Sequence, residues 1–401
     1  MRLRIFITVL LAVVGTTVVA QSAPGTLLDV TLVGTRELSE IEEMATPMFD
    51  AYGVPDLSFA VDLYRITYQS SDFDGSPATV GANLFVPQVR SGGALPLLVF
   101  GSGTTGISDH CAPSREEPSI RRWGHYEANM LAYASNGIVA VFPDYLGFND
   151  PDRPQRYFSK DAEAHVMLDA VRAARAFFDR RITQASLSEY VFLGGYSQGG
   201  HAAFSAADKQ PEYAPDVEID GVVSYGGTMN VETLLREGPY YAPYIVYTYS
   251  RMYEEINPEE LFLDRWVETL DEDVERMCVD QFQVYFPFDG TQLYSLAFYR
   301  ALQAGRLAEE YPVLKAALDQ NIAGLSGHGV PSLVIQGDDD IIITTAEQTA
   351  YVEQLCESGS PSQYLVLEGV RHRFTRAAGF RATLQWIDGV MAGEPATNCG
   401  R

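Results

Sequence analysis

The stretch Val191–Gly200, VFLGGYSQGG, places one serine among four glycines directly after an apolar run. Within it, Gly195, Ser197 and Gly199 form the pattern G-x-S-x-G, and the residues from Gly199 onward, GGHAAFSAAD, favour a helix. A sharp turn of this kind strains the serine backbone and projects its hydroxyl from the C-terminal end of a parallel sheet. We therefore expect an α/β sheet with Ser197 as a nucleophile, in preference to a glycine-rich structural turn.

Apolar runs typical of buried strands alternate with helical patterns along most of the chain. The expected strands lie at 95–100, 137–145, 190–196, 221–226, 331–337 and 363–369, and the expected helices at 161–178, 344–355 and 380–391. Two earlier segments, 57–70 and 78–88, flank the turn SDFDGSP and predict an antiparallel hairpin. This alternation favours a mainly parallel central sheet with helices on both faces.

The alternation stops between residues 228 and 328, a segment rich in tyrosine and acidic residues, with helical patterns and no clear strand. We expect this segment, called the insert below, to form a mainly helical cap over a sheet built from 21–227 and 329–401. Because tyrosines combine an apolar body with a polar tip, Tyr244 and Tyr247 are expected to bind substrate. Two alternatives remain: the tyrosines form the insert's own core, or the insert is a separate helical domain without a role at the site.

The N-terminal residues 1–20 predict a secretory signal peptide. A basic start, MRLR, precedes an apolar run, and the small residues VVA precede Gln21, so cleavage is expected near Ala20. The alternative is a membrane anchor, which Gly15, Thr16 and Thr17 disfavour. We therefore expect a secreted or periplasmic protein.

The chain carries a net charge of -25, which disfavours binding to nucleic acid. Its four cysteines are an even number in a chain predicted to be exported, so two disulfides are expected, with three connectivities open. None of the cysteines has C-x-x-C spacing, and we expect no metal.

A serine needs a base, and the base needs an orienting acid. Among six histidines, His372 follows the last apolar strand and is the expected base, whereas His201 is expected to pack behind the serine. The acid should follow a strand between them, where Asp338, Asp339 and Asp340 occur. We expect Asp340 to orient His372, with the other two shaping the turn or capping the next helix.

Backbone N–H groups are expected to stabilise a developing oxyanion. One belongs to Gln198, directly after the serine, and the other to the loop FGSGTTG at 100–106. Thr104 is the expected donor there, with Thr105 as the second choice and a simple turn as the alternative. Tyr196 and Thr105 are also expected to contact substrate.

With these residues identified, the sequence resembles the α/β-hydrolases and, among them, the secretory lipase family that contains fungal lipase A. The resemblance covers most of residues 50–395. Its motifs are GSGTTG (101–106), CAPS (111–114), FPDYLGF (142–148), DAVRAAR (169–175) and GGYSQGG (194–200), with the GDDD and RH segments. One departure is Ser102, where relatives often have histidine, so the choice between the two threonine donors stays open.

The resemblance implies an α/β-hydrolase fold with a Ser197, Asp340 and His372 triad. It also implies disulfides Cys111–Cys278 and Cys356–Cys399, and no cofactor. The implied activity is that of a secreted lipase or esterase acting through an acyl-enzyme on hydrophobic acyl or aromatic esters, small molecules or lipids, with polyesters among the candidates.

Two alternatives of other classes stay open. One is a serine peptidase of aminopeptidase type, in which Glu254, Glu255, Glu259 and Glu260 would hold the substrate amine. The other is a non-catalytic binding protein on the same fold. A transient contact with a lipid interface is a further expectation, and the sequence predicts no oligomeric state.

Overall fold

The computed structural model describes residues 22–89, 93–117, 120, 123–150, 153–180 and 183–399. The signal peptide expected at residues 1–20 lies outside the described residues. Among the described residues, no helix combines the length and the apolar character needed to cross a membrane.

One sheet of nine strands runs through the described part of the chain, in the order β1-β2-β3-β5-β4-β6-β7-β8-β9. The strands are β1 (Leu27–Arg36), β2 (Val61–Ser71), β3 (Pro77–Pro87), β4 (Ala94–Gly101), β5 (Val139–Pro143), β6 (Ser186–Tyr196), β7 (Gly221–Tyr225), β8 (Ser332–Gly337) and β9 (Ser362–Leu367). The pairs from β1 to β3 and the β3–β5 pair are antiparallel, and the remaining pairs are parallel. The expectation of a mainly parallel sheet that begins with a hairpin is confirmed.

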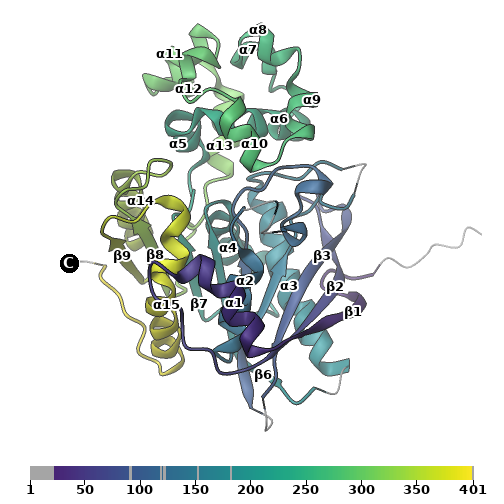
Figure 1. Cartoon of the computed structure of the whole chain (residues 1–401). Helices are drawn as coiled ribbons and strands as arrows, with labels where there is room; N and C mark the ends of the chain where they lie inside the picture. The colour runs from purple at the N-terminus through teal and green to yellow at the C-terminus, as the bar shows by residue number, and fades with distance from the viewer. Residues whose placement is uncertain are drawn as a thin grey trace, which may run out of the picture.

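Helices cover both faces of the sheet (Figure 1). On one face lie α3 (Lys160–Arg180), α4 (Gln198–Tyr213) and α14 (Thr345–Glu357), and on the other α1 (Leu38–Phe49), α2 (Tyr126–Ser135) and α15 (Thr375–Met391). Because both faces are covered, the central strands are rich in apolar residues, and β5, β7 and β8 are buried at every position.

Three elements in the N-terminal half of the chain, β1, α1 and α2, were not among the strands and helices expected from the sequence. β1 is an edge strand that leaves Leu28, Leu32 and Val33 exposed, so its apolar residues do not alternate cleanly. α1 contains Pro47 near its end, which disfavours a helix. Nearly every residue of α2 is buried, so it lacks the one-sided apolar stripe by which a helix is recognised.

The insert lies between β7 and β8 and forms a group of short helices at one end of the sheet (Figure 1). These helices are α5 (Val231–Glu237), α6 (Ala242–Met252), α7 (Pro258–Leu261), α8 (Asp264–Val267), α9 (Leu270–Arg276), α10 (Val279–Tyr285), α11 (Leu296–Gln303), α12 (Leu307–Glu310) and α13 (Pro312–Gln320). Aromatic rings form much of its interior: Phe282 lies 4.4 Å from the ring of Tyr244 and 5.3 Å from that of Tyr241.

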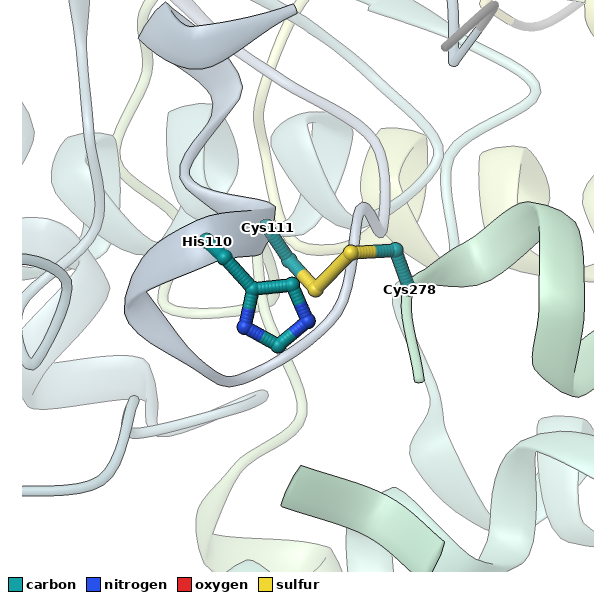
Figure 2. Close-up of side chains that lie close together, drawn as sticks. All are labelled: His110, Cys111 and Cys278. Atoms are coloured by element: carbon teal, nitrogen blue, oxygen red, sulfur yellow. A yellow bond between two sulfur atoms is a disulfide. The ribbon is translucent and has the colours of Figure 1, made fainter. Parts of the chain in front are cut away.

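Two disulfides join distant parts of the chain, in the pairs that the resemblance implied. Cys111–Cys278 connects the segment after β4 to the insert, across a sequence separation of 167 residues, and Cys356–Cys399 connects the end of α14 to the C-terminal segment. His110 lies beside the first disulfide (Figure 2). Because the two sulfurs are bonded to each other, they are not thiolate ligands for a metal.

Candidate active site

Ser197 occupies the turn between β6 and α4, in a conformation that non-glycine residues rarely adopt. Its φ is 54° and its ψ is -114°. A Cβ on Gly195 would collide with the backbone of Gly199, and one on Gly199 with the backbone of Gly101. The glycines of G-x-S-x-G are therefore required for strand and helix to approach closely enough to hold the strained serine.

Asp340 and His372 form a buried hydrogen-bonded pair on the loops after β8 and β9. His372 Nδ1 lies 2.7 Å from Asp340 Oδ2. The other carboxylate oxygen accepts the backbone N–H groups of Ile342 and Ile343, at 2.8 and 3.0 Å. Burial raises the pKa of Asp340, but the charge and hydrogen bond of His372 and these N–H groups outweigh it, so that the pKa lies below its ordinary value. The carboxylate thus stays ionised beside the imidazole.

A cavity of about 730 Å³ is lined by Ser197, His372, Thr104 and Tyr196 together. His372 Nε2 is buried and has no hydrogen-bond partner among the described residues. Since Asp340 occupies Nδ1, Nε2 is the ring nitrogen left to exchange a proton with a group in this cavity. Gly226 makes room for the pair, because a Cβ there would lie 2.9 Å from His372 Nδ1.

The two threonines expected as alternative oxyanion donors are placed differently. Thr104 lines the cavity, and its hydroxyl lies 2.6 Å from the hydroxyl of Tyr157. Thr105 is outside the cavity lining, and its carbonyl accepts the backbone N–H of Val279 at 2.8 Å. The geometry therefore favours Thr104 as donor and gives Thr105 no contact with the cavity. Gln198 is fully buried directly after the serine.

The two other aspartates of the run and His201 have other contacts. Asp338 accepts the backbone N–H of Gly369 at 2.6 Å, and Asp339 pairs with Arg371 at 3.0 Å on the cavity rim. His201 is buried behind the serine, where it contacts the Glu163 carboxylate.

The expected substrate-binding tyrosines divide into two groups. Tyr196 lines the cavity, whereas Tyr244 and Tyr247 do not. The Tyr244 hydroxyl donates to Met277 O at 2.5 Å, and that of Tyr247 to Glu275 at 2.5 Å, so both belong to the interior of the insert. The cavity lining therefore does not support substrate binding by Tyr244 and Tyr247, which stays a prediction. Tyr241, three residues before Tyr244, lines the cavity instead.

Sequence reasoning also missed Arg376, which is buried and lines the cavity. Its guanidinium carbon lies 4.6 Å from the ring centroid of Tyr126 and 4.7 Å from that of Tyr196. It donates to Asn129 Oδ1 at 3.1 Å and to Gly124 O at 2.6 Å. The segment RHRFTR shows a cluster of arginines, but nothing in its pattern distinguishes the buried one.

The sheet topology and the strained serine between β6 and α4 define an α/β-hydrolase. Residues 125–399 match the secretory lipase family, and the chain belongs to that family.

Curated relatives resemble the chain in sequence, and a solved structure shares its fold. Over 322 residues the chain is 24% identical to Lipase A of Arthroderma benhamiae, covering 75% of this chain and 64% of that protein. It is 23% identical to the secreted triacylglycerol lipase LIP4 of Malassezia globosa, covering 83% and 73%. A ligand-bound form of the rice cell wall degrading esterase LipA from Xanthomonas oryzae shares the fold, with a TM-score of 0.74 at 21% identity over 92% of this chain and 97% of that one. This chain thus spans just under two thirds of Lipase A.

Proposed function

We propose that this protein is a secreted serine hydrolase of the lipase or esterase type, which cleaves carboxylic esters through an acyl-enzyme. The observation that carries the proposal is a single cavity lined by Ser197 and His372, with His372 Nδ1 bound to the buried Asp340. Membership of the secretory lipase family supports the same reaction.

In the proposed mechanism, Ser197 Oγ attacks the ester carbonyl and His372 Nε2 accepts its proton. Asp340 holds the Nδ1–H and stabilises the imidazolium. Backbone N–H groups of Thr104 and Gln198 stabilise the oxyanion. The imidazolium then protonates the leaving alcohol, and the same histidine activates the water that releases the acid from Ser197.

The cavity walls favour a hydrophobic acyl or aromatic group. Tyr196, Tyr241, Trp123 and Ile342 line it beside the serine and histidine. Aromatic and aliphatic walls gain free energy when they cover an apolar substrate group. We propose esters of small molecules or lipids as substrates, with polyesters among the candidates. The insert contributes Tyr241, Val279 and Gln283 to the lining, which supports its role as a cap.

The aminopeptidase alternative finds less support. The four glutamates that would hold a substrate amine, Glu254, Glu255, Glu259 and Glu260, are absent from the cavity lining. Asp280 and Asp339 line it, but Asp339 pairs with Arg371, and Asp280 accepts the indole N–H of Trp123 at 3.2 Å.

Turnover of p-nitrophenyl butyrate compared with an aminoacyl p-nitroanilide tests the proposal. We expect ester cleavage and covalent labelling of Ser197 by a fluorophosphonate, located by peptide mass spectrometry. Ser186→Ala, at the opposite end of the same strand, is the matched control and should keep both properties. Strong anilide cleavage with negligible ester cleavage would overturn the proposal in favour of a peptidase.

For export, we propose that residues 1–20 are removed as a signal peptide. N-terminal sequencing of the secreted protein checks this.

A further inference from the structure

A buried tyrosine outside the cavity lining holds the loop that carries Thr104. Tyr157 is completely buried, and its hydroxyl lies 2.6 Å from Thr104 Oγ1. Burial raises the pKa of Tyr157 well above its ordinary value, so the hydroxyl keeps its proton. Its ring packs 4.4 Å from Phe158 and 6.0 Å from Tyr244 of the insert. A neutral, fully packed tyrosine therefore fixes the Thr104 side chain from behind.

The next residue, Phe158, has a φ of 55°, which is rare for a bulky side chain. Two buried groups hold its peptide units in this conformation. Its N–H donates to Glu163 Oε1 at 3.1 Å, and its carbonyl accepts the hydroxyl of Tyr249 from the insert at 3.1 Å. Strained backbone of this kind persists only where the surroundings determine it, and it is common near active sites.

The same glutamate also holds the residue after the nucleophile. Glu163 Oε1 accepts the side-chain amide of Gln198 at 2.7 Å, and Oε2 lies 2.6 Å from His201 Nδ1. The glutamate is 1% exposed and lies in the first turn of α3. One short segment, from Tyr157 to Glu163, thus contacts both residues whose N–H groups are the proposed oxyanion donors.

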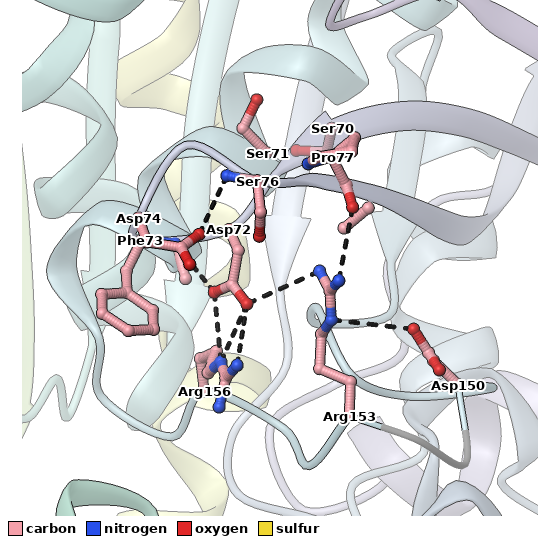
Figure 3. Close-up of polar contacts among 12 residues, drawn as sticks. Ser70, Ser71, Asp72, Phe73, Asp74, Ser76, Pro77, Asp150, Arg153 and Arg156 are labelled. Atoms are coloured by element: carbon pink, nitrogen blue, oxygen red, sulfur yellow. Dashed lines mark hydrogen bonds and ion pairs between the residues drawn. The ribbon is translucent and has the colours of Figure 1, made fainter. Parts of the chain in front are cut away.

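Ion pairs anchor this segment on its N-terminal side (Figure 3). Arg156, directly before Tyr157, pairs with the buried carboxylate of Asp72 at 2.9 Å, and Arg153 lies 3.5 Å from the same carboxylate. Asp72 follows the last residue of β2, so the segment is tied to the central sheet. Its position is therefore determined from both ends.

We propose that Tyr157 and Glu163 are positioning residues that set the spacing between the two oxyanion donors, Tyr157 through Thr104 and Glu163 through Gln198. The inference rests on the proposed ester hydrolysis. Neither side chain needs to touch the substrate, since both act through the loop or helix turn that carries a donor.

The direct test is Tyr157→Phe, which removes one hydroxyl and keeps the ring. With p-nitrophenyl butyrate, kcat should fall about tenfold while KM changes by less than about twofold, because a displaced Thr104 N–H weakens an interaction made with the transition state alone. Inhibition by butylboronic acid, whose serine adduct is tetrahedral, should weaken by a similar factor. The matched control is Tyr294→Phe, which removes a buried hydroxyl that donates to Leu235 O within the insert and should leave kcat unchanged.

A double-mutant cycle separates positioning from a general loss of packing. Thr104→Val removes the other half of the same hydrogen bond but keeps the backbone N–H. In that background, adding Tyr157→Phe should have almost no further effect on kcat. An undiminished further loss would overturn the role of Tyr157, as would a Tyr157→Phe enzyme with wild-type kcat and wild-type boronate affinity.

The Glu163 arm is tested from its partner, because a change of the buried glutamate itself could unfold the protein. Gln198→Met removes the side-chain amide that Glu163 holds and keeps the backbone donor, so kcat should fall severalfold with KM nearly unchanged. Wild-type kcat in this variant would overturn the Glu163 part.

The underlying function has its own test. If Ser197→Ala remained active, the proposed triad would fail. An inactive Ser197→Ala beside a fully active Tyr157→Phe would refute only the positioning.

Discussion

The edge of the sheet that carries the proposed triad and the insert hold their polar side chains by different means. At the edge, Ser197, Asp340 and His372 follow β6, β8 and β9, and glycines that have no space for a Cβ fix the backbone around them. In the insert, tyrosine hydroxyls donate hydrogen bonds to carbonyl groups of other segments, as from Tyr244 to Met277 O and from Tyr294 to Leu235 O. Backbone geometry thus positions the proposed triad, whereas side-chain packing shapes the insert above it. Four experiments test this difference, in decreasing order of effect.

The largest effect is expected from Ser197→Ala or His372→Ala. Each should lower kcat by about 10⁵- to 10⁶-fold, because members of a triad act as a unit, and the double variant should be little worse than either alone. Esterase assays at high enzyme concentration, with thermal melting to verify folding, measure this. Additive losses in the double variant would contradict a shared mechanism.

Next, substitutions within the aspartate run compare three neighbouring carboxylates. Asp340→Asn should lower kcat about 10⁴-fold, because an amide at this position would leave the imidazole in the wrong tautomer. Asp338→Asn and Asp339→Asn should lower it far less, since these side chains contact Gly369 N–H and Arg371. Kinetic measurements on the three purified variants test this order of effects. A reversed order would mean that another aspartate orients the imidazole.

The two disulfides test how the insert is attached. On the chain-entropy relation, removing Cys111–Cys278 should cost roughly 5 kcal/mol of unfolding free energy and removing Cys356–Cys399 roughly 4 kcal/mol. Only the first joins the insert to the segment after β4. We therefore expect Cys111→Ser with Cys278→Ser to reduce both stability and kcat/KM, and Cys356→Ser with Cys399→Ser to reduce stability alone. Denaturant titration measures the stability, and kinetics on folded protein measure kcat/KM. Equal losses of kcat/KM in the two variants would contradict this expectation.

The smallest effect concerns the tyrosines of the insert. Tyr241→Ala should change the ratio of kcat/KM between short- and long-chain p-nitrophenyl esters by about tenfold, because Tyr241 lines the cavity. Tyr247→Ala should lower stability and leave the ratio unchanged, since its hydroxyl contacts Glu275 outside the cavity lining. Equal shifts of the ratio in both variants would mean that the wall extends through the interior of the insert.

The sheet could be predicted from the sequence because its central strands are apolar runs. The proposed site could be predicted because its residues follow the ends of those strands. Ser197, Asp340 and His372 each follow such a strand. The structure places Ser197 and His372 at one cavity, with Asp340 bound to His372 behind it. The three elements β1, α1 and α2 were not predicted, since an edge strand, a proline-containing helix and a buried helix each lack the expected periodicity.

Side chains whose roles depend on tertiary contacts were not predictable in the same way. Tyr241 and Tyr244 share a residue type and a short segment, yet only Tyr241 reaches the cavity. Arg376 and Tyr157 have hydrogen-bond partners from other parts of the chain, Asn129 and Thr104. No periodicity within a single segment contains that information.

The place of the insert in the chain also has a consequence for folding kinetics. Because about 106 residues separate β7 from β8, these adjacent parallel strands can pair only after a long loop closes. Loop-closure entropy grows slowly with length, by about 0.6 kcal/mol for each doubling, so the long connection costs little equilibrium stability. Pairs distant in sequence do form late and slowly, however. We therefore expect insert segments of quite different lengths to be exchangeable at this position with small changes in the stability of the sheet and larger changes in its folding rate.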